Sequence, residues 1–140
     1  MITRNRGFAI SLPALVGLLL VACAAPAAKV EAEIHPRYAD DRPIMVAVRT
    51  EGTGAAESAL AEALRGVLLS KSYSPLSVGG LPDPETGFLR ARLMSEAAPW
   101  TSDVLLEDAQ GTVLFRAWVK EFRGDLPALA SELLRALPEK

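Results

Sequence analysis

Cysteine and histidine are almost missing from this 140-residue sequence, which contains one of each, Cys23 and His35. A single cysteine excludes a disulfide framework within the chain. The shortage also leaves no members for a Cys–His pair, a Ser–His–Asp triad or a zinc site built from cysteine and histidine. His35 stands beside Pro36 in a polar segment, where we expect it to be solvated. We therefore predict no catalytic residue of these classes and no metal site.

An excess of either charge is also lacking. The chain carries 15 basic and 17 acidic residues, a formal net charge of −2, and contains no run of five or six like charges. Proteins that bind nucleic acid need a basic patch or stripe for the phosphate backbone. The mixed pattern indicates a solvated surface instead, and we expect no nucleic-acid partner.

Motifs that hold cofactors are missing as well. Neither the P-loop pattern nor G-x-G-x-x-G occurs at Gly79-Gly80 or elsewhere, so no cofactor is expected. The paired acids Asp40-Asp41 and Glu107-Asp108 are neighbours in sequence, and such neighbours do not face each other across a cleft. A glycosidase-type pair of carboxylates that meet only in space stays open, but the sequence otherwise predicts that the protein is not an enzyme.

A secretion signal is what the N-terminus does contain. Residues 1–6 hold two arginines, Arg4 and Arg6, and residues 7–28 hold no charged residue. A basic segment followed by an apolar segment and small residues is typical of a signal peptide. One alternative is an uncleaved transmembrane helix, because 22 uncharged residues can span a bilayer. Pro13 and Gly17 weaken that helix. Another is an ordinary cleaved signal peptide in which the cysteine is incidental.

The end of this apolar segment, Leu20-Val21-Ala22-Cys23, resembles the lipobox of bacterial lipoproteins. The resemblance implies cleavage between Ala22 and Cys23, two acyl chains on the Cys23 thiol, and a further acyl chain (such as palmitate) on the new amine. Several acyl chains hold a protein firmly on a membrane. Ala24 follows the cysteine where lipoproteins retained in the inner membrane carry Asp. The resemblance therefore implies an outer-membrane protein that faces the periplasm, if the host has two membranes.

Three regions follow from this interpretation: a lipoprotein signal peptide over residues 1–22, a lipidated N-terminus and flexible tether over 23–43, and one domain over 44–140. The tether is predicted because residues 24–43 are rich in alanine, proline and scattered charges, with no sustained apolar period. Loss of Arg4 and Arg6 leaves 13 basic residues against 17 acidic ones, a net charge of −4 for the mature chain.

The domain shows alternating strand and helix patterns. We expect a strand over 44–49, a helix over 55–70 capped by Thr53, and an edge strand over 72–78 that contains Pro75. Strands over 88–95, 100–108 and 112–122 should follow, the last two joined by a tight turn at Gly111. A final helix is expected from an Asp125 cap to Pro138. The order β-α-β-β-β-β-α predicts a small α+β domain, a mostly antiparallel sheet with two helices on one face.

One face of the last strand mixes cations with aromatic rings. Strict alternation places Arg116, Trp118, Lys120 and Phe122 together with Leu114, opposite Val113, Phe115, Ala117 and Val119. Tryptophan and arginine are enriched in protein interfaces, so these four residues form a candidate partner surface. The alternatives are a Trp118 covered by another part of the chain, or contact with anionic lipid headgroups.

The domain as a whole loosely resembles small periplasmic lipoprotein domains, such as penicillin-binding-protein activators and curli-secretion-like lipoproteins. The residues concerned are IMVAVR, the helix that leads into Ser72-Tyr73, and the D-x-x-G turn at Asp108; the family pattern has Gly where Ser72 stands. The resemblance implies a non-catalytic interaction or assembly module of the cell envelope with a protein partner. A carrier for a lipid or another small apolar ligand is the alternative.

Overall fold

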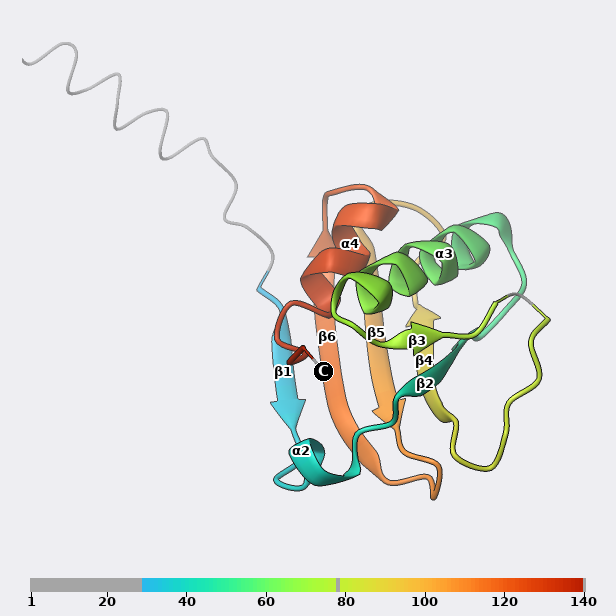
Figure 1. Ribbon diagram of the computed structural model, residues 1–140. Helices are drawn as coiled ribbons and strands as arrows, with labels where there is room; N and C mark the ends of the chain where they lie inside the picture. Colours follow the sequence, from blue (N-terminus) through green and yellow to red (C-terminus); the bar gives the residue numbers. More distant parts are fainter. Residues whose placement is uncertain (1–28, 78, 140) are drawn as a thin grey trace, which may run out of the picture.

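The computed structural model describes residues 29–77 and 79–139 (Figure 1). Six strands and three helices follow one another along the chain, and we keep the labels of Figure 1. They are β1 (Glu31–Ile34), α2 (Tyr38–Asp41), β2 (Met45–Thr50), α3 (Ala55–Ser70), β3 (Ser74–Pro75), β4 (Gly87–Leu93), β5 (Trp100–Glu107), β6 (Val113–Phe122) and α4 (Leu126–Leu133). From residue 44 onward this is the predicted order β-α-β-β-β-β-α.

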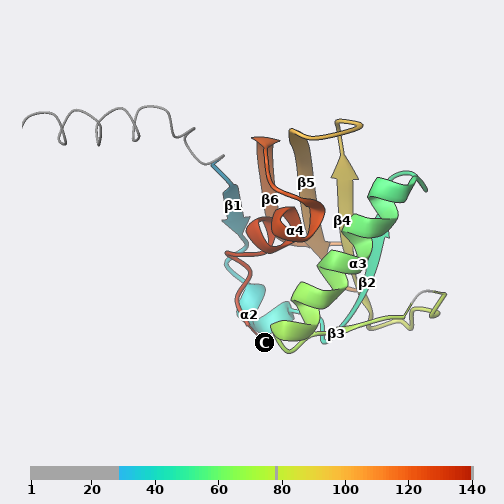
Figure 2. The same ribbon diagram turned by 90° about the horizontal axis from the view of Figure 1, so that it is seen from above.

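The strands form one mixed sheet in the order β1-β6-β5-β4-β2-β3. The four strands from β1 to β4 in this order pair antiparallel, whereas β2 runs parallel to both β4 and β3. Figures 1 and 2 show α3 and α4 side by side on the same face of the sheet. The predicted α+β class is confirmed, with the predicted edge position of β3.

The apolar stripe of α3 explains why this helix lies on the sheet. Leu60, Leu64 and Leu68 recur at helical spacing and are completely buried. The helix begins after Gly54, whose position as N-cap makes the prediction of a Thr53 cap wrong. Leu69, next to Leu68, is 66% exposed, so α3 buries one stripe only.

The end of α3 has an unusual residue for its conformation. Ser72 has a φ of +70°, in the left-handed region that favours glycine. The Tyr73 N–H donates to the Leu68 carbonyl at 3.0 Å, and the Ser72 N–H donates to that of Leu69 at 3.1 Å. These bonds complete the last turn and direct Tyr73 into the core, where it is 1% exposed.

The last helix starts as predicted. The Asp125 carboxylate accepts a hydrogen bond of 2.8 Å from the Ala128 N–H, and Pro127 lies in the first turn. The helix ends at Leu133, earlier than predicted, although Leu134 and Leu137 beyond it remain buried. The chain after α4 therefore continues to pack on the core through turns, in which the Leu134 N–H donates to the Ala130 carbonyl at 3.1 Å and the Leu137 N–H to the Leu134 carbonyl at 3.0 Å.

The predicted tether is wrong for residues 31–43. β1 pairs with β6 along Glu31–Ile34, and the Tyr38 ring in α2 is 4% exposed. Pro43 packs so closely on Gly87 that a Cβ there would lie 2.3 Å from the proline Cγ. The domain therefore begins before residue 44, and residues 1–28, with the predicted signal peptide and Cys23, lie outside the described residues.

Two tyrosine hydroxyls hold this N-terminal part against the rest of the domain. The Tyr38 and Tyr73 hydroxyls are hydrogen-bonded to each other, and both lie near the Pro138 carbonyl, which accepts from Tyr73 at 3.1 Å. Burial raises the pKa of Tyr73 to about 12.

Within the described part of the chain, no helix has the length and apolar character that a membrane span requires.

Candidate functional site

One face of the sheet lies away from α3 and α4 (Figure 2), and we call it the uncovered face. It carries charged and aromatic side chains of β2, β4 and β6. Strand pairing aligns one row across it, in which neighbours share a face. From one edge inward the row is Glu33, Arg116, Leu105, Arg90 and Arg49. Three arginines from three different strands thus share one row with a leucine.

A second row runs beside the first. Arg92 on β4 aligns with Asp103 on β5, and Asp103 aligns with Trp118 on β6. The Arg92 guanidinium donates to both carboxylate oxygens of Asp103, at 2.5 and 3.3 Å. This hydrogen bond, together with the negative charge of Asp103, raises the pKa of Arg92. Arg92 and Asp103 therefore form a forked ion pair across the sheet.

The remaining arginines fall into two kinds. Arg90 donates to Glu107 at 2.9 Å and forms an ion pair with it. Its guanidinium also lies 5.6 Å from the centre of the Phe88 ring, over which Arg49 lies at 4.9 Å, and Arg116 lies 5.1 Å from the centre of the Trp118 ring. These distances are typical of cation–π contacts. Within residues 29–77 and 79–139, no carboxylate forms an ion pair with Arg49 or Arg116.

The structure brings together part of the predicted partner surface. Arg116 and Lys120 are exposed on the uncovered face, and Trp118 is half-buried between them. The placement of Phe122 on this face is wrong. Glu121 has a φ of +55° and the register shifts there, so that Phe122 pairs with Trp100 and packs against the core. A β-bulge of this kind moves the following side chains to the other face.

A second bulge changes the start of β6. Glu107 pairs with Val113 and Leu106 with Phe115, which leaves Leu114 as the extra residue. Leu114 is consequently buried in the core, and Val113 is 41% exposed. The predicted faces of Leu114 and Val113 are therefore also wrong, because strict alternation does not survive a bulge.

The other arginines of the uncovered face were not predicted as a site. Alternation in 88–95 places Arg90 and Arg92 on one face, and this signal is correct. Their meeting with Arg49 and Arg116 depends on the strand order, because β2 follows β4 in space although it precedes it in sequence. Single-sequence patterns do not contain that order.

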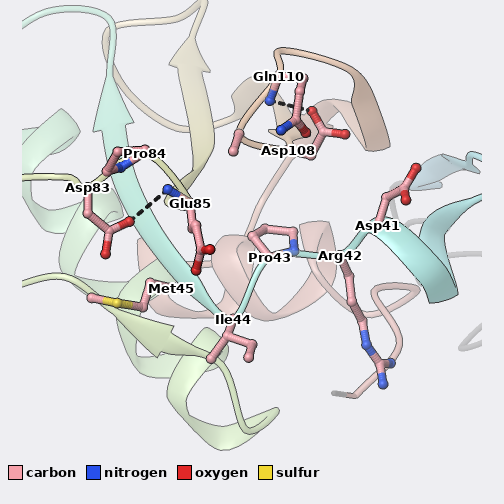
Figure 3. A pocket seen from close by; sticks show the side chains of 11 residues that line it. Asp41, Arg42, Pro43, Ile44, Met45, Asp83, Pro84, Glu85, Asp108 and Gln110 are labelled. Carbon is pink, nitrogen blue, oxygen red and sulfur yellow. Dashed lines mark hydrogen bonds between the residues drawn. The ribbon is translucent and has the colours of Figure 1, made fainter.

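A hollow of ≈ 400 Å³ lies at one end of the sheet among residues 41–45, 83–85 and 108–110 (Figure 3). Of the four acids that line it, Asp83 and Asp108 stabilise local turns, and Asp41 pairs with Arg37. Asp83 accepts from the Glu85 N–H and the Thr86 hydroxyl, and Asp108 accepts from the N–H groups of Gln110 and Thr112, all at 2.9 Å. Across the described ranges, no three His, Cys, Asp or Glu side chains gather as metal ligands would. We assign no chemistry to this hollow.

The apolar stripes on which the carrier hypothesis depends are part of the packed core. The completely buried residues of the two helices that face the sheet are Leu60, Leu64, Leu68, Leu129, Ala130 and Leu133. Ordinary packing thus explains their pattern. The carrier remains an alternative without an observation that favours it.

Comparison with known proteins identifies a structure of similar fold but no family. No family model and no curated protein matches the chain. Among solved structures, PelC from Paraburkholderia phytofirmans, solved as a dodecamer, is similar with a TM-score of 0.52 and 16% sequence identity. The match covers 76% of this chain and 91% of that chain. At this identity the similarity shows a common fold alone.

Proposed function

We propose that this chain is an exported lipoprotein, anchored on a bacterial envelope membrane through Cys23, whose domain acts as a non-catalytic interaction or assembly module. The uncovered face of the sheet carries the proposal. It presents exposed charges from β2, β4 and β6 and a half-buried Trp118 on a rigid sheet. Arginine and tryptophan on a rigid surface are typical of contact sites between proteins.

The anchor and the domain act together in this proposal. Only the seven residues from Ala24 to Val30 separate Cys23 from the start of β1. Fully extended, they reach about 25 Å at ~3.3–3.6 Å per residue. A lipid-anchored Cys23 would therefore keep the domain close to the membrane surface, where it meets other envelope proteins.

The dodecameric state of the PelC structure supports the assembly part of the proposal. By analogy with that assembly, we propose that a surface of this domain also serves association. The occupant of the uncovered face is accordingly either an envelope protein or a further copy of this chain, and one experiment distinguishes them.

Site-specific photo-crosslinking in the intact cell envelope tests the contact surface. We expect a photoreactive residue at Lys120 to form adducts, and one at Leu69, exposed on α3 on the other side of the domain, to form none. Adduct masses at multiples of the chain mass indicate self-assembly, and other masses indicate a different partner. Equal labelling at both positions, or none at Lys120, would contradict the proposal.

Substitution of the cysteine tests the anchor independently. Cys23→Ala should abolish metabolic labelling with a radioactive or clickable fatty acid and release the protein from the membrane fraction. Ala24→Asp is the matched control, because it should leave acyl labelling intact and change only the membrane in which the protein resides. Unchanged labelling of Cys23→Ala refutes the lipoprotein assignment.

A further inference from the structure

We infer that a hollow in the uncovered face binds a ligand that carries two or more oxyanion groups, carboxylate or phosphate. This inference rests on the proposed function, in which the uncovered face is the contact surface, and it states which chemical groups that face binds. Its test uses purified protein and does not depend on any partner in the cell.

The hollow has a volume of ≈ 410 Å³ and is formed by side chains from β2, β4, β5 and β6. Its lining includes Leu105, which lies between Arg116 and Arg90 in the row that continues to Arg49. A volume of this size accommodates a small molecule. The site is thus a depression in a rigid sheet, which fixes the spacing of the backbone positions that carry its charges.

The charges around the hollow are unbalanced. Four arginines (Arg49, Arg90, Arg92 and Arg116) line it, against two acids, Glu51 and Asp103. Asp103 is occupied by the forked pair with Arg92, and Arg90 is paired with Glu107 at the margin. An excess of cations in one hollow contrasts with the chain's net charge of −2, and attracts anions locally.

Arg49 and Arg116 supply the binding groups. Both are exposed, and among residues 29–77 and 79–139 neither has a carboxylate within ion-pair distance. Each guanidinium is held by an aromatic ring, Phe88 or Trp118, which orients it without using its N–H donors. A guanidinium with free donors presents a planar fork that matches a carboxylate or a phosphate.

The distance between these two arginines determines how far apart the oxyanion groups of the ligand must be. Arg49 lies on β2 and Arg116 on β6, three strand intervals apart. At ~4.7–4.9 Å per interval their backbones are about 14 Å apart, a span that two flexible side chains shorten from both ends. A single small anion contacts one of them, whereas a ligand with separated oxyanion groups contacts both.

Isothermal titration calorimetry of the full lipidated chain in detergent, with tripolyphosphate and citrate as probes, tests the inference. Wild-type protein should bind at least one probe, and the preferred probe identifies phosphate or carboxylate as the recognised group. Arg49→Gln combined with Arg116→Gln should weaken binding by about tenfold or more, because two charge-assisted contacts are lost. Raising the salt concentration should weaken wild-type binding as well.

Two control substitutions separate a site from general attraction to positive charge. Lys120→Gln removes a charge from the same face outside the hollow, and Arg135→Gln removes one beyond α4, where the side chain is 79% exposed. Both controls should keep the wild-type affinity within about twofold. The inference would be overturned if the wild-type protein bound neither probe. It would also be overturned if the controls lost as much affinity as the double variant. Crosslinking at Lys120 would still decide the proposed function separately.

Discussion

The two faces of the sheet are made by the same strands and differ almost completely in chemistry. The face under α3 and α4 is apolar, and Leu89, Val104 and Leu106 at its centre are completely buried. The uncovered face alternates arginines with acids and two aromatic rings. A one-residue change of register would exchange the faces. The apolar face therefore fixes the register, and in doing so it fixes the spacing of the charges on the other face.

This comparison predicts that stability comes mainly from the covered face. Leu68 and Leu69 are neighbours in α3, one completely buried and the other 66% exposed. Leu68→Ala should lower the free energy of unfolding by about 2–5 kcal/mol, because it removes buried methyl groups and leaves a cavity. Leu69→Ala should change it by less than about 0.5 kcal/mol. Urea unfolding followed by circular dichroism measures both, and similar losses would contradict the one-sided burial of α3.

A second prediction concerns the buried phenol at the border of the covered layer. The pKa of Tyr73 is about 12 in the folded protein, above its ordinary value near 10. The folded state thus retains the proton more tightly than the unfolded chain does. The protonated Tyr73 hydroxyl therefore contributes its full stabilisation below pH ~10. As the pH rises towards ~12 this stabilisation is lost, and the free energy of unfolding falls by about 2 kcal/mol.

Tyrosinate absorbance tests this directly, because the chain contains only Tyr38 and Tyr73. In Tyr73→Phe the alkaline loss of stability should be smaller than in wild type, and one tyrosine fewer should ionise near pH 12. If both tyrosines of the folded wild-type protein ionise near pH 10, the burial of the Tyr73 hydroxyl is contradicted.

The connection between α3 and the edge strand gives a third, smaller prediction. Ser72 adopts a φ of +70°, which costs a non-glycine residue about 1–2 kcal/mol. Ser72→Gly should therefore raise the free energy of unfolding by about 0.5–1 kcal/mol, after the greater entropy of glycine in the unfolded chain is deducted. Ser70→Gly, within the last turn of α3, should lower it by a similar amount. Thermal unfolding of both variants measures these changes. A destabilised Ser72→Gly variant would contradict the left-handed conformation of Ser72.

The contrast between the faces also explains what could be predicted from the sequence. Apolar spacing predicted α3, α4 and the strands from β2 to β6, because each element buries a regular stripe. β1 was missed although Ala32 and Ile34 alternate with Glu31 and Glu33, because the run is only four residues long and lies in a segment rich in alanine, proline and charges. Phe122 was misplaced because nothing local marks the bulge at Glu121. The arginine row was missed because strand order is a tertiary property.

The smallest effect is expected from the ion pairs of the uncovered face. Arg90 and Glu107 are joined at 2.9 Å, but half of the Arg90 side chain is exposed. Such pairs contribute about 0.2–1 kcal/mol, since solvent and salt screen them. A double-mutant cycle with Arg90→Gln and Glu107→Gln should measure a coupling in this range that decreases at high salt. A coupling above about 2 kcal/mol would mean that these charges stabilise the fold as the leucines do. A small coupling leaves the charges of the uncovered face available for binding at little cost to the fold.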